Sequence, residues 1–482
     1  MKSISCLLVF CSLLFISACV KDKTKNVIDE GGYPANIAAI MVTKCATAGC
    51  HNTASKSGAA GLDFSTWEKA MEGGNGGAAI IPYYHKQSTV FLFCNTYDDL
   101  GTKVAPSMPY NASPLSHDEV ITLRDWIDNG APNKDGFVKF SDNAQRHKVY
   151  ITNQACQLVA VMDAESKLAM RYVEVGTTGQ AGSTHRVMVS PDGSFWCVCS
   201  LGGNVVKKYS AVDESFLGQV TIGAGNWNTM VITKDGTTAY VVDQANGKVA
   251  EVNLVNYTLI SGAPAEGFNT PHGSALSADE KFLYVTGQTG NFIYKIDTAT
   301  FFSDMQQISL DGNPPVASSS LDIHDILFSP DKSKYFLTCQ KSNEVRVMNA
   351  ANDSLLAIIP VGTFPQEMAF STSTPYLFVT CMEDLTTFPG NRGSVYIINY
   401  NTLSQVGYVN TGWQPHGVAV DDVNKLVYVA NRNATTGGPA PHHTTDCGGR
   451  NGYLTLIDLN TLNLVSGFKT ELSVDPYSCA YR

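Results

Sequence analysis

A strand pattern that recurs seven times between residues 147 and 482 constrains the fold of this chain more than any other feature. Each copy is a short run that alternates β-branched and aromatic residues, such as "YITNQ" at Tyr150, "YVVDQ" at Tyr240 and "YVANR" at Tyr428. Residues of these types are enriched in strands. The other copies begin at Trp196, Tyr284, Phe336 and Phe378. Recurrence of one segment predicts a single structural unit that is used seven times.

Further strands flank these copies. Before six of them stands a run such as "HGSALSADE" from His272 or "HGVAVDDVN" from His416, and after them comes a third run such as "GKVAEVNL". With a weaker fourth strand, each unit has the composition of a propeller blade. The first copy lacks its preceding strand, and "PYSCAYR" at residues 476–482 supplies one. A C-terminal strand that completes the N-terminal blade closes the ring and removes exposed sheet edges.

Residues 147–482 therefore resemble the YVTN-repeat family of seven-bladed β-propellers along their whole length. The resemblance implies an all-β domain of seven four-stranded blades that is closed by the C-terminal strand. It does not imply one activity, because propellers serve many unrelated functions.

The N-terminus predicts export. Met1 and Lys2 precede an apolar run, "CLLVFCSLLFIS", and small residues lead to Cys19, which is typical of a signal peptide. The stretch "ISAC" resembles the lipobox of bacterial lipoproteins, which implies lipidation of Cys19. Lipid chains there would hold the protein at a membrane surface. We expect a cell-envelope lipoprotein, in the outer membrane and facing the periplasm or the surface.

The stretch "KCATAGCHN" at residues 44–52 contains two cysteines and an adjacent histidine. Haem attachment commonly uses C-x-x-C-H, whereas here four residues separate Cys45 from Cys50. The two thiols would bind the porphyrin, and His51 would bind the iron from the same side. A second axial ligand is often a methionine from another loop, and Met108 precedes Pro109 in such a loop.

The segment after Met108 supports the same interpretation. Ser116 predicts the N-cap of a helix that ends near Gly130. The pattern "MP…LS…E…L…WI…GA" resembles the end of small c-type cytochrome domains of bacterial envelopes. The resemblance implies one covalent haem c with Cys45 and Cys50 as attachment residues.

The fold class predicted from these features is multidomain, with a small all-α cytochrome c-like domain before the all-β propeller. The expected boundaries are a signal peptide at 1–18, a lipidated tether at 19–35, a haem domain at 36–135, a linker at 136–146 and the propeller at 147–482. A zinc site at Cys45, Cys50 and His51 is the alternative, with His85 and Cys94 as further ligands. Zinc would leave the Met-Pro loop and the following helix unexplained.

Four of the ten histidines fall at one equivalent position of the predicted inner strands. They are His185, His272, His324 and His416, and the same slot holds Asn228, Gln366 and Tyr477. A long loop at 433–452 adds His442 and His443 on the same face. Three roles remain open for this putative propeller site: hydrogen bonds to backbone and water, a second metal ion, or acid–base catalysis.

The remaining features restrict partners and function. A net charge of −10 without a basic stripe argues against a nucleic-acid partner. Blade loops bring Cys156 and Cys447 near each other, although sequence leaves disulfide connectivity open. We expect an electron-transfer protein with one haem, whose propeller face binds a redox partner protein or a small ligand. The alternative is an oxidoreductase with a metal or second cofactor at the histidines, with the haem as its electron port. Whether the chain is an enzyme stays open.

Overall fold

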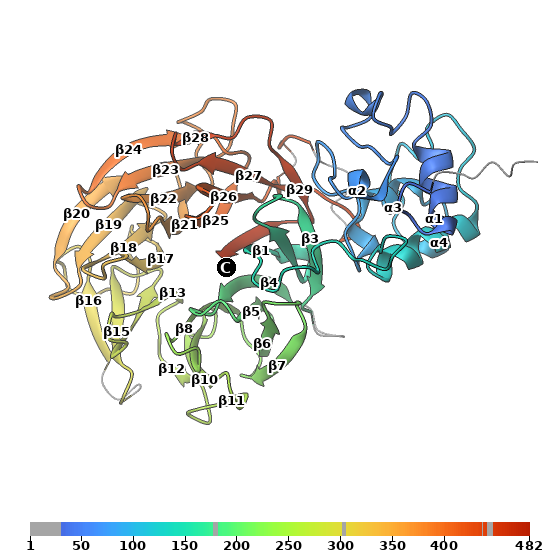
Figure 1. Cartoon of the computed structure of the whole chain (residues 1–482). Helices are drawn as coiled ribbons and strands as arrows, with labels where there is room; N and C mark the ends of the chain where they lie inside the picture. Colours follow the sequence, from blue (N-terminus) through green and yellow to red (C-terminus); the bar gives the residue numbers. More distant parts are fainter. Residues whose placement is uncertain (1–29, 177–181, 301–304, 436, 441–446) are drawn as a thin grey trace, which may run out of the picture.

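The structure, a computed structural model, describes residues 30–482 except 177–181, 301–304, 436 and 441–446. Residues 30–146 form an N-terminal segment of short helices and turns, and residues 147–482 form β-sheets (Figure 1). The signal peptide and Cys19 lie outside the described residues. No helix in the described part of the chain is both long and apolar enough to cross a membrane.

The described residues form seven antiparallel sheets, which we number in chain order. Sheet 1 combines β1 (Lys148–Asn153), β2 (Leu158–Asp163) and β3 (Ala169–Glu174) with the C-terminal β30 (Pro476–Tyr481). Sheet 2 contains β4 (Ser183–Val189), β5 (Phe195–Leu201), β6 (Val205–Ser210) and β7 (Phe216–Thr221). Sheet 3 contains β8 (Trp227–Ile232), β9 (Thr238–Asp243), β10 (Lys248–Asn253), β11 (Thr258–Leu259) and β12 (Ala265–Glu266).

The other four sheets repeat this plan. Sheet 4 contains β13 (Pro271–Leu276), β14 (Phe282–Gly287), β15 (Phe292–Asp297) and β16 (Met305–Ser309). Sheet 5 contains β17 (Ile323–Phe328), β18 (Lys334–Cys339), β19 (Glu344–Asn349) and β20 (Leu355–Pro360). Sheet 6 contains β21 (Pro365–Phe370), β22 (Tyr376–Cys381), β23 (Ser394–Asn399) and β24 (Ser404–Val409). Sheet 7 contains β25 (Pro415–Asp421), β26 (Leu426–Asn431), β27 (Gly452–Asp458), β28 (Asn463–Leu464) and β29 (Thr470–Leu472).

The innermost strands make the arrangement propeller-like. Each of β4, β8, β13, β17, β21 and β25 contacts the innermost strand of the next sheet, and β30 contacts both β25 and β4. β30 also pairs antiparallel with β1, with Val149 opposite Tyr481. Figure 1 shows the seven sheets around a common centre, where the C-terminus lies. The C-terminal strand thus links the last sheet to the first.

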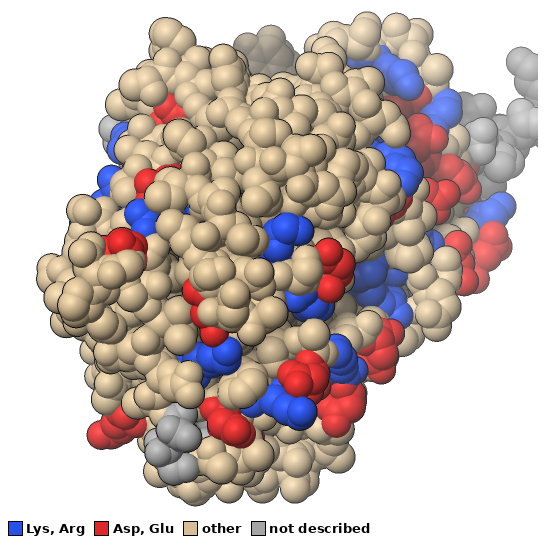
Figure 2. Space-filling model, turned by 90° about the vertical axis from the view of Figure 1, so that its left-hand side faces the viewer, with Lys and Arg blue, Asp and Glu red and all other residues tan. Residues whose placement is uncertain are grey.

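The hydrophobic core of this region lies between neighbouring sheets. One cluster joins Phe195 and Cys197 of sheet 2 to Trp227 and Val241 of sheet 3. Middle strands such as β9 are buried along most of their length, whereas the outer strands β20 and β24 expose most of their residues. On the side where β20 lies, Figure 2 shows Lys and Arg among Asp and Glu, and wide areas without either.

The N-terminal segment contradicts the predicted fold class, because no all-α cytochrome-like domain is present. Its α-helices are α1 (Ala35–Ile40), α2 (Trp67–Ala70), α3 (Thr89–Cys94) and α4 (His117–Asp128), and only α4 is longer than two turns. Short helical turns η1 (Met41–Cys45), η2 (Lys56–Gly58), η3 (His85–Gln87) and η4 (Asp98–Leu100) lie between them. Glycines at 73, 74, 76 and 77 and prolines at 106, 109 and 114 interrupt the intervening stretches, which prevents longer helices.

The helix that the sequence predicted after Met108 is nevertheless confirmed. Ser116 caps α4, where its hydroxyl accepts from the amide of Glu119 and the Glu119 carboxylate accepts from the amide of Ser116. The helix buries Val120, Leu123 and Ile127. These residues face one core that also contains Tyr33, Phe64, Trp67 and Phe91. The segment is therefore organised around a single apolar cluster rather than a helical bundle.

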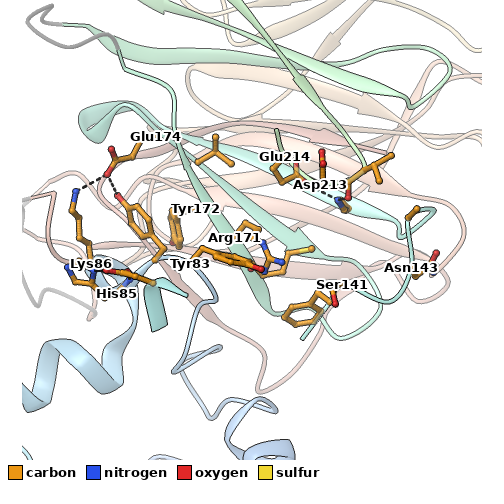
Figure 3. Close-up of a pocket in the computed structure, with 18 residues that line it drawn as sticks. Tyr83, His85, Lys86, Ser141, Asn143, Arg171, Tyr172, Glu174, Asp213 and Glu214 are labelled. Atoms are coloured by element: carbon orange, nitrogen blue, oxygen red, sulfur yellow. Dashed lines mark hydrogen bonds and ion pairs between the residues drawn. The ribbon is translucent and has the colours of Figure 1, made fainter. Parts of the chain in front are cut away.

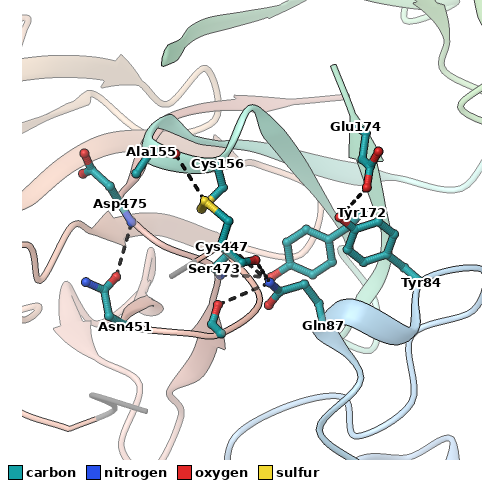
Figure 4. Close-up of a disulfide and its surroundings, with 11 residues drawn as sticks. Tyr84, Gln87, Ala155, Cys156, Tyr172, Glu174, Cys447, Asn451, Ser473 and Asp475 are labelled. Carbon is teal, nitrogen blue, oxygen red and sulfur yellow. Dashed lines mark hydrogen bonds between the residues drawn. A yellow bond between two sulfur atoms is a disulfide. The ribbon is translucent and has the colours of Figure 1, made fainter. Parts of the chain in front are cut away.

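Contacts across sheets 1 and 7 join the segment to the sheet region. Cys156 forms a disulfide with Cys447, the connectivity that sequence left open (Figure 4). Gln87 of the segment donates to the carbonyl oxygens of Cys447 (2.9 Å) and Gly449 (3.2 Å). The side chain of Arg450 donates in turn to the carbonyl oxygen of Gln87. One segment residue thus binds the same loop that the disulfide fixes.

Candidate functional site

The turn from Cys45 to His51 follows directly from α1 through η1. The amide of His51 donates to the carbonyl oxygen of Cys45 (3.1 Å), and the amide of Cys50 donates to that of Thr47 (3.0 Å). Ser55 adds a hydrogen bond from its hydroxyl to the carbonyl oxygen of Cys50 (2.5 Å). These bonds fold the four intervening residues into a compact loop, which brings the backbones of Cys45 and His51 together despite the long spacing.

The three side chains of this turn differ in burial. Cys45 is buried in the core of the segment, Cys50 is exposed, and His51 is half-buried with its ring 5.0 Å from that of Phe64. Burial lowers the pKa of His51, so the ring is neutral at neutral pH. The ring hydrogen-bonds to the backbone of Ala59, while its buried Nδ1 has no hydrogen-bond partner. A neutral imidazole with one nitrogen unpaired has a lone pair for a metal.

Met108 lies against the same apolar core as Cys45. Its amide donates to the carbonyl oxygen of Phe93 (2.8 Å), which holds the Met108 loop beside α3. A salt bridge of 2.5 Å between Lys44 and Glu119 ties the Cys45 turn to the start of α4. One apolar cluster therefore contacts all three residues: it contains Cys45, Met108 packs against it, and its Phe64 ring lies beside the ring of His51.

Sequence reasoning treated Cys94 only as a zinc ligand, and the structure gives it a different neighbour. Cys94 is buried and hydrogen-bonds to Cys45, and this bond lowers the pKa of Cys45. His85, the other proposed zinc ligand, places its Nδ1 2.8 Å from Asp128. No group of three or more His, Cys, Asp or Glu in the described ranges is placed to hold a metal ion. The described side chains thus form no zinc site at the Cys45 turn, and the same finding applies to the four histidines of the inner strands.

The four histidines of the inner strands lie together at the centre of the sheet region. Ring centroids are 6.1 Å apart for His185 and His272, 4.0 Å for His272 and His324, and 5.8 Å for His324 and His416. Tyr477 lies 3.6 Å from His416 and 4.4 Å from His185. His442 and His443 lie outside the described residues.

Three of these rings bind the backbone of the next sheet. Nδ1 of His185 lies 2.7 Å from the carbonyl oxygen of Asn228, and Nδ1 of His272 lies 2.8 Å from that of His324. His416 makes the equivalent bond to Tyr477 (3.1 Å) across the ring closure. Such bonds join neighbouring sheets through their inner strands. The geometry thus gives the histidines a structural role as cross-sheet hydrogen bonds.

Burial also keeps these histidines uncharged. It lowers the pKa of His272 to about 4 and those of His185, His324 and His416 well below the ordinary value. A neutral imidazole has one N–H group. In His185, His272 and His416 the contact with a carbonyl oxygen places this N–H on Nδ1, which donates to that oxygen. Nδ1 of His324 and Nε2 of His416 are buried without a hydrogen-bond partner. These two nitrogen atoms of the four rings could still form a hydrogen bond or bind a metal ion.

A charged cluster beside the histidines was missed from sequence. Arg186 donates to the carboxylate of Glu367 (2.7 Å), and both interact with the buried Asp325. Burial raises the pKa of Glu367 to about 7. Each member directly follows a slot residue, in "HR", "HD" and "QE". These dipeptides could have indicated the cluster from sequence. Successive residues of a strand face opposite sides of the sheet, and the inner strands are buried on both sides, so the charged residue after each slot residue is buried as well.

Comparisons with known proteins support the fold alone. No protein-family model and no curated protein sequence matches the chain. The chain is similar in structure to hydrazine synthase of Kuenenia stuttgartiensis, with a TM-score of 0.50, 18% identity, and coverage of 64% of this chain and 94% of that chain. A functionally unknown protein from Desulfotomaculum acetoxidans gives 0.53 and 14%, with coverage of 69% and 98%. A putative 6-phosphogluconolactonase from Bacteroides uniformis gives 0.52 and 14%, with coverage of 70% and 100%. These similarities fit an all-β fold of several sheets.

Proposed function

We propose that this chain is an electron-transfer protein of the cell envelope that carries one haem, bound covalently through Cys45 and Cys50. The observation that carries the proposal is the turn from Cys45 to His51. It brings two thiols and a neutral imidazole into one loop, and the imidazole has a buried nitrogen without a partner. This donor set suits c-type haem, whose iron prefers a histidine from the attachment loop. The proposal requires no cytochrome-like helical fold.

Each residue of the site has a separate task. Cys45 and Cys50 would tether the group, and His51 and Met108 would bind its iron. When bound, haem iron supplies reversible one-electron transfer. The hydrogen bond to Ala59 orients the His51 ring, as outer contacts of metal-binding histidines commonly do. The apolar core around Cys45 and Met108 would exclude water from the bound group and so favour a higher reduction potential.

A gel stain tests the covalent bond. Denatured wild-type protein should keep the peroxidase stain of haem, because thioether bonds survive denaturation. Cys45→Ala combined with Cys50→Ala should lose it. Cys197→Ala, which removes a buried cysteine of sheet 2, serves as the matched control and should stain like the wild type. A stained double variant would reject the attachment residues.

Met108→Ala tests the second axial ligand. The variant should keep its stain but show a lower reduction potential, because thioether sulfur favours the ferrous state. Redox titration followed by absorbance measures the shift. An unchanged potential would mean that another side chain binds the iron.

The envelope location rests on Cys19, which we propose as the lipid-bearing residue. Cys19→Ser should move the protein from the membrane fraction to the soluble fraction, since a lipid anchor there is the proposed attachment. Fractionation followed by immunoblotting measures this, with Cys197→Ala as a control for loss of a cysteine. Membrane retention of Cys19→Ser would refute the anchor.

A second metal at His185, His272, His324 and His416 stays a prediction. Nδ1 of His324 and Nε2 of His416 are buried ring nitrogens without a hydrogen-bond partner, which leaves two donors for such a metal. Elemental analysis of the purified protein decides between the two functions. Iron alone supports an electron-transfer protein, and stoichiometric copper or zinc beside iron supports the oxidoreductase.

A further inference from the structure

A pocket of about 830 Å³ lies between the N-terminal segment and sheet 1 (Figure 3). Tyr83 and Tyr84 of the segment form one wall, and Met170, Arg171 and Tyr172 of β3 form another. Phe140 and Val212 add apolar surface. The pocket is distant in the fold from the histidine layer, which lies on the inner strands, and it contains none of the proposed haem ligands.

The acidic side chains around this pocket already have partners. Glu174 binds Lys86 (2.8 Å) and accepts from the hydroxyl of Tyr84 (3.0 Å). Asp128 lies 2.8 Å from Nδ1 of His85. Asp213 accepts from the hydroxyl of Ser215 (2.7 Å).

Glu214, the fourth acidic residue, is bound most fully. Its carboxylate accepts from Lys148 (2.5 Å) and from the indole N–H of Trp196 (2.8 Å), deep under the pocket. Each of these four acidic side chains therefore has a hydrogen-bond partner other than Arg171.

Arg171 is the contrasting group. Among the described residues it forms no ion pair, and its Nη1 donates to the carbonyl oxygen of Met170 (2.6 Å). Its burial lowers its pKa, yet a guanidinium stays protonated at neutral pH. A guanidinium presents five N–H donors in a planar fork that matches a carboxylate. Arg171 therefore has no carboxylate at ion-pair distance, although Glu214 lies near enough to attract its charge.

Tyr83 fixes the position of this guanidinium. The ring of Tyr83 lies 4.7 Å from the guanidinium carbon of Arg171, and Figure 3 shows the two stacked. The Tyr83 amide donates to the carbonyl oxygen of Ile127 (2.8 Å). A Cβ at Gly130 would lie 2.8 Å from the Tyr83 ring, so only glycine leaves room for the ring there. The end of α4 thus holds Tyr83 against Arg171, although Tyr83 itself is 49% exposed.

We propose that this pocket binds a small organic acid, whose carboxylate pairs with Arg171 and whose apolar, planar body lies among Tyr83, Phe140 and Tyr172. Aromatic walls with a few convergent polar or charged groups are typical of small-molecule sites. The chain would thus bind a small molecule between its N-terminal segment and sheet 1, and this binding would not depend on haem.

Benzoate is a suitable probe, with benzamide as its neutral counterpart of the same shape. Isothermal titration of the full-length protein should show saturable benzoate binding. Arg171→Gln should weaken it about tenfold to a hundredfold, the range expected for a hydrogen bond to a charged group. Arg124→Gln removes an arginine of α4 that pairs with Asp125, and it should leave binding unchanged.

Several results would overturn the proposal. They are absence of benzoate binding by the wild type, equal affinity for benzamide, equal affinity of Arg171→Gln, and full competition by inorganic phosphate, which would indicate a site for simple anions. If Arg171→Gln fails to fold by circular dichroism, Tyr83→Ala keeps the charge and tests the same pocket. It should weaken benzoate binding several-fold, because the stacked position of Arg171 is lost, and unchanged binding there would also refute the site.

Discussion

Residues 147–482 and residues 30–146 satisfy their backbone polar groups in different ways. In the sheet region, ladders pair the two middle strands of each sheet on both sides, and apolar clusters lie between neighbouring sheets. In the N-terminal segment, turns are held by single hydrogen bonds around one cluster. That cluster contains Cys45, Cys94 and Met108. The comparison indicates that the sheets are stable through repetition and closure, whereas the segment depends on one core and on what its sulfur atoms bind.

Removal of residues 476–482 should have the largest effect on the stability of the sheet region. Sheet 1 would lose β30, the strand that contacts both β25 and β4, and the ring would open. We expect loss of cooperative thermal unfolding, measured by circular dichroism. Removal of Arg482 alone is the control and should leave a cooperative transition. A cooperative transition in the longer truncation would contradict the role of closure.

Lys148→Met should have the second-largest effect, a loss of free energy of unfolding in the sheet region. Lys148 is buried, binds Glu214 (2.5 Å) and donates to the carbonyl oxygens of Ala211 and Val212. Its loss leaves a buried carboxylate without its charge partner, which costs about 3–5 kcal/mol. Urea unfolding measures the change in free energy. Lys86→Met is the control, because its exposed pair with Glu174 joins the two regions and contributes about 1 kcal/mol or less. Equal losses would refute the distinction between buried and exposed pairs.

The buried histidines predict a pH dependence of the sheet region. Unfolded histidine titrates near about 6.5, whereas the folded chain lowers the pKa of His272 to about 4. Between these values only the unfolded chain binds the proton. The free energy of unfolding should therefore fall as pH falls below about 6.5, by about 1.4 kcal/mol per pH unit for each such histidine. Glu367 and Asp325, whose pKa values burial raises, bind protons in the folded chain and offset part of this.

Urea unfolding at pH 7.5, 6 and 5 measures this slope. His272→Asn should reduce this slope by the contribution of one histidine, about 1.4 kcal/mol per pH unit. Asparagine suits the position, because Asn228 occupies the same slot in sheet 3 and donates to the carbonyl oxygen of His272 (3.4 Å). An identical slope in the variant would show that His272 titrates alike in the folded and unfolded chains.

Ser116→Ala should have the smallest effect and should act on the N-terminal segment. It removes the side-chain cap of α4, at a cost of about 1 kcal/mol. Hydrogen exchange should rise at residues 117–120 and stay unchanged in sheets 2 to 6. Thr122→Ala on the exposed side of α4 is the control. Faster exchange in the distant sheets would mean that the two regions unfold as one unit.

Sequence reasoning succeeded where local rules decide the structure. Alternation located strands such as β9 and β26, and Ser116 with Gly130 located α4. It failed for the rest of the segment, because the resemblance to c-type cytochrome domains implied an all-α domain, whereas glycine and proline limit the helices. Contacts between distant residues carry no local signal, so Cys94 beside Cys45 and Arg171 beneath Tyr83 could not be predicted.

Peptide mass spectrometry after trypsin digestion of the non-reduced protein tests the central claim most directly. Cleavage after Lys44 and Lys56 gives residues 45–56, which contain Cys45, Cys50 and His51, whereas Cys94 falls in residues 87–103. Covalent haem predicts that peptide 45–56 carries the mass of one haem and that peptide 87–103 has a free thiol. Peptide 45–56 without haem, joined to peptide 87–103 by a disulfide between Cys45 and Cys94, would contradict the account.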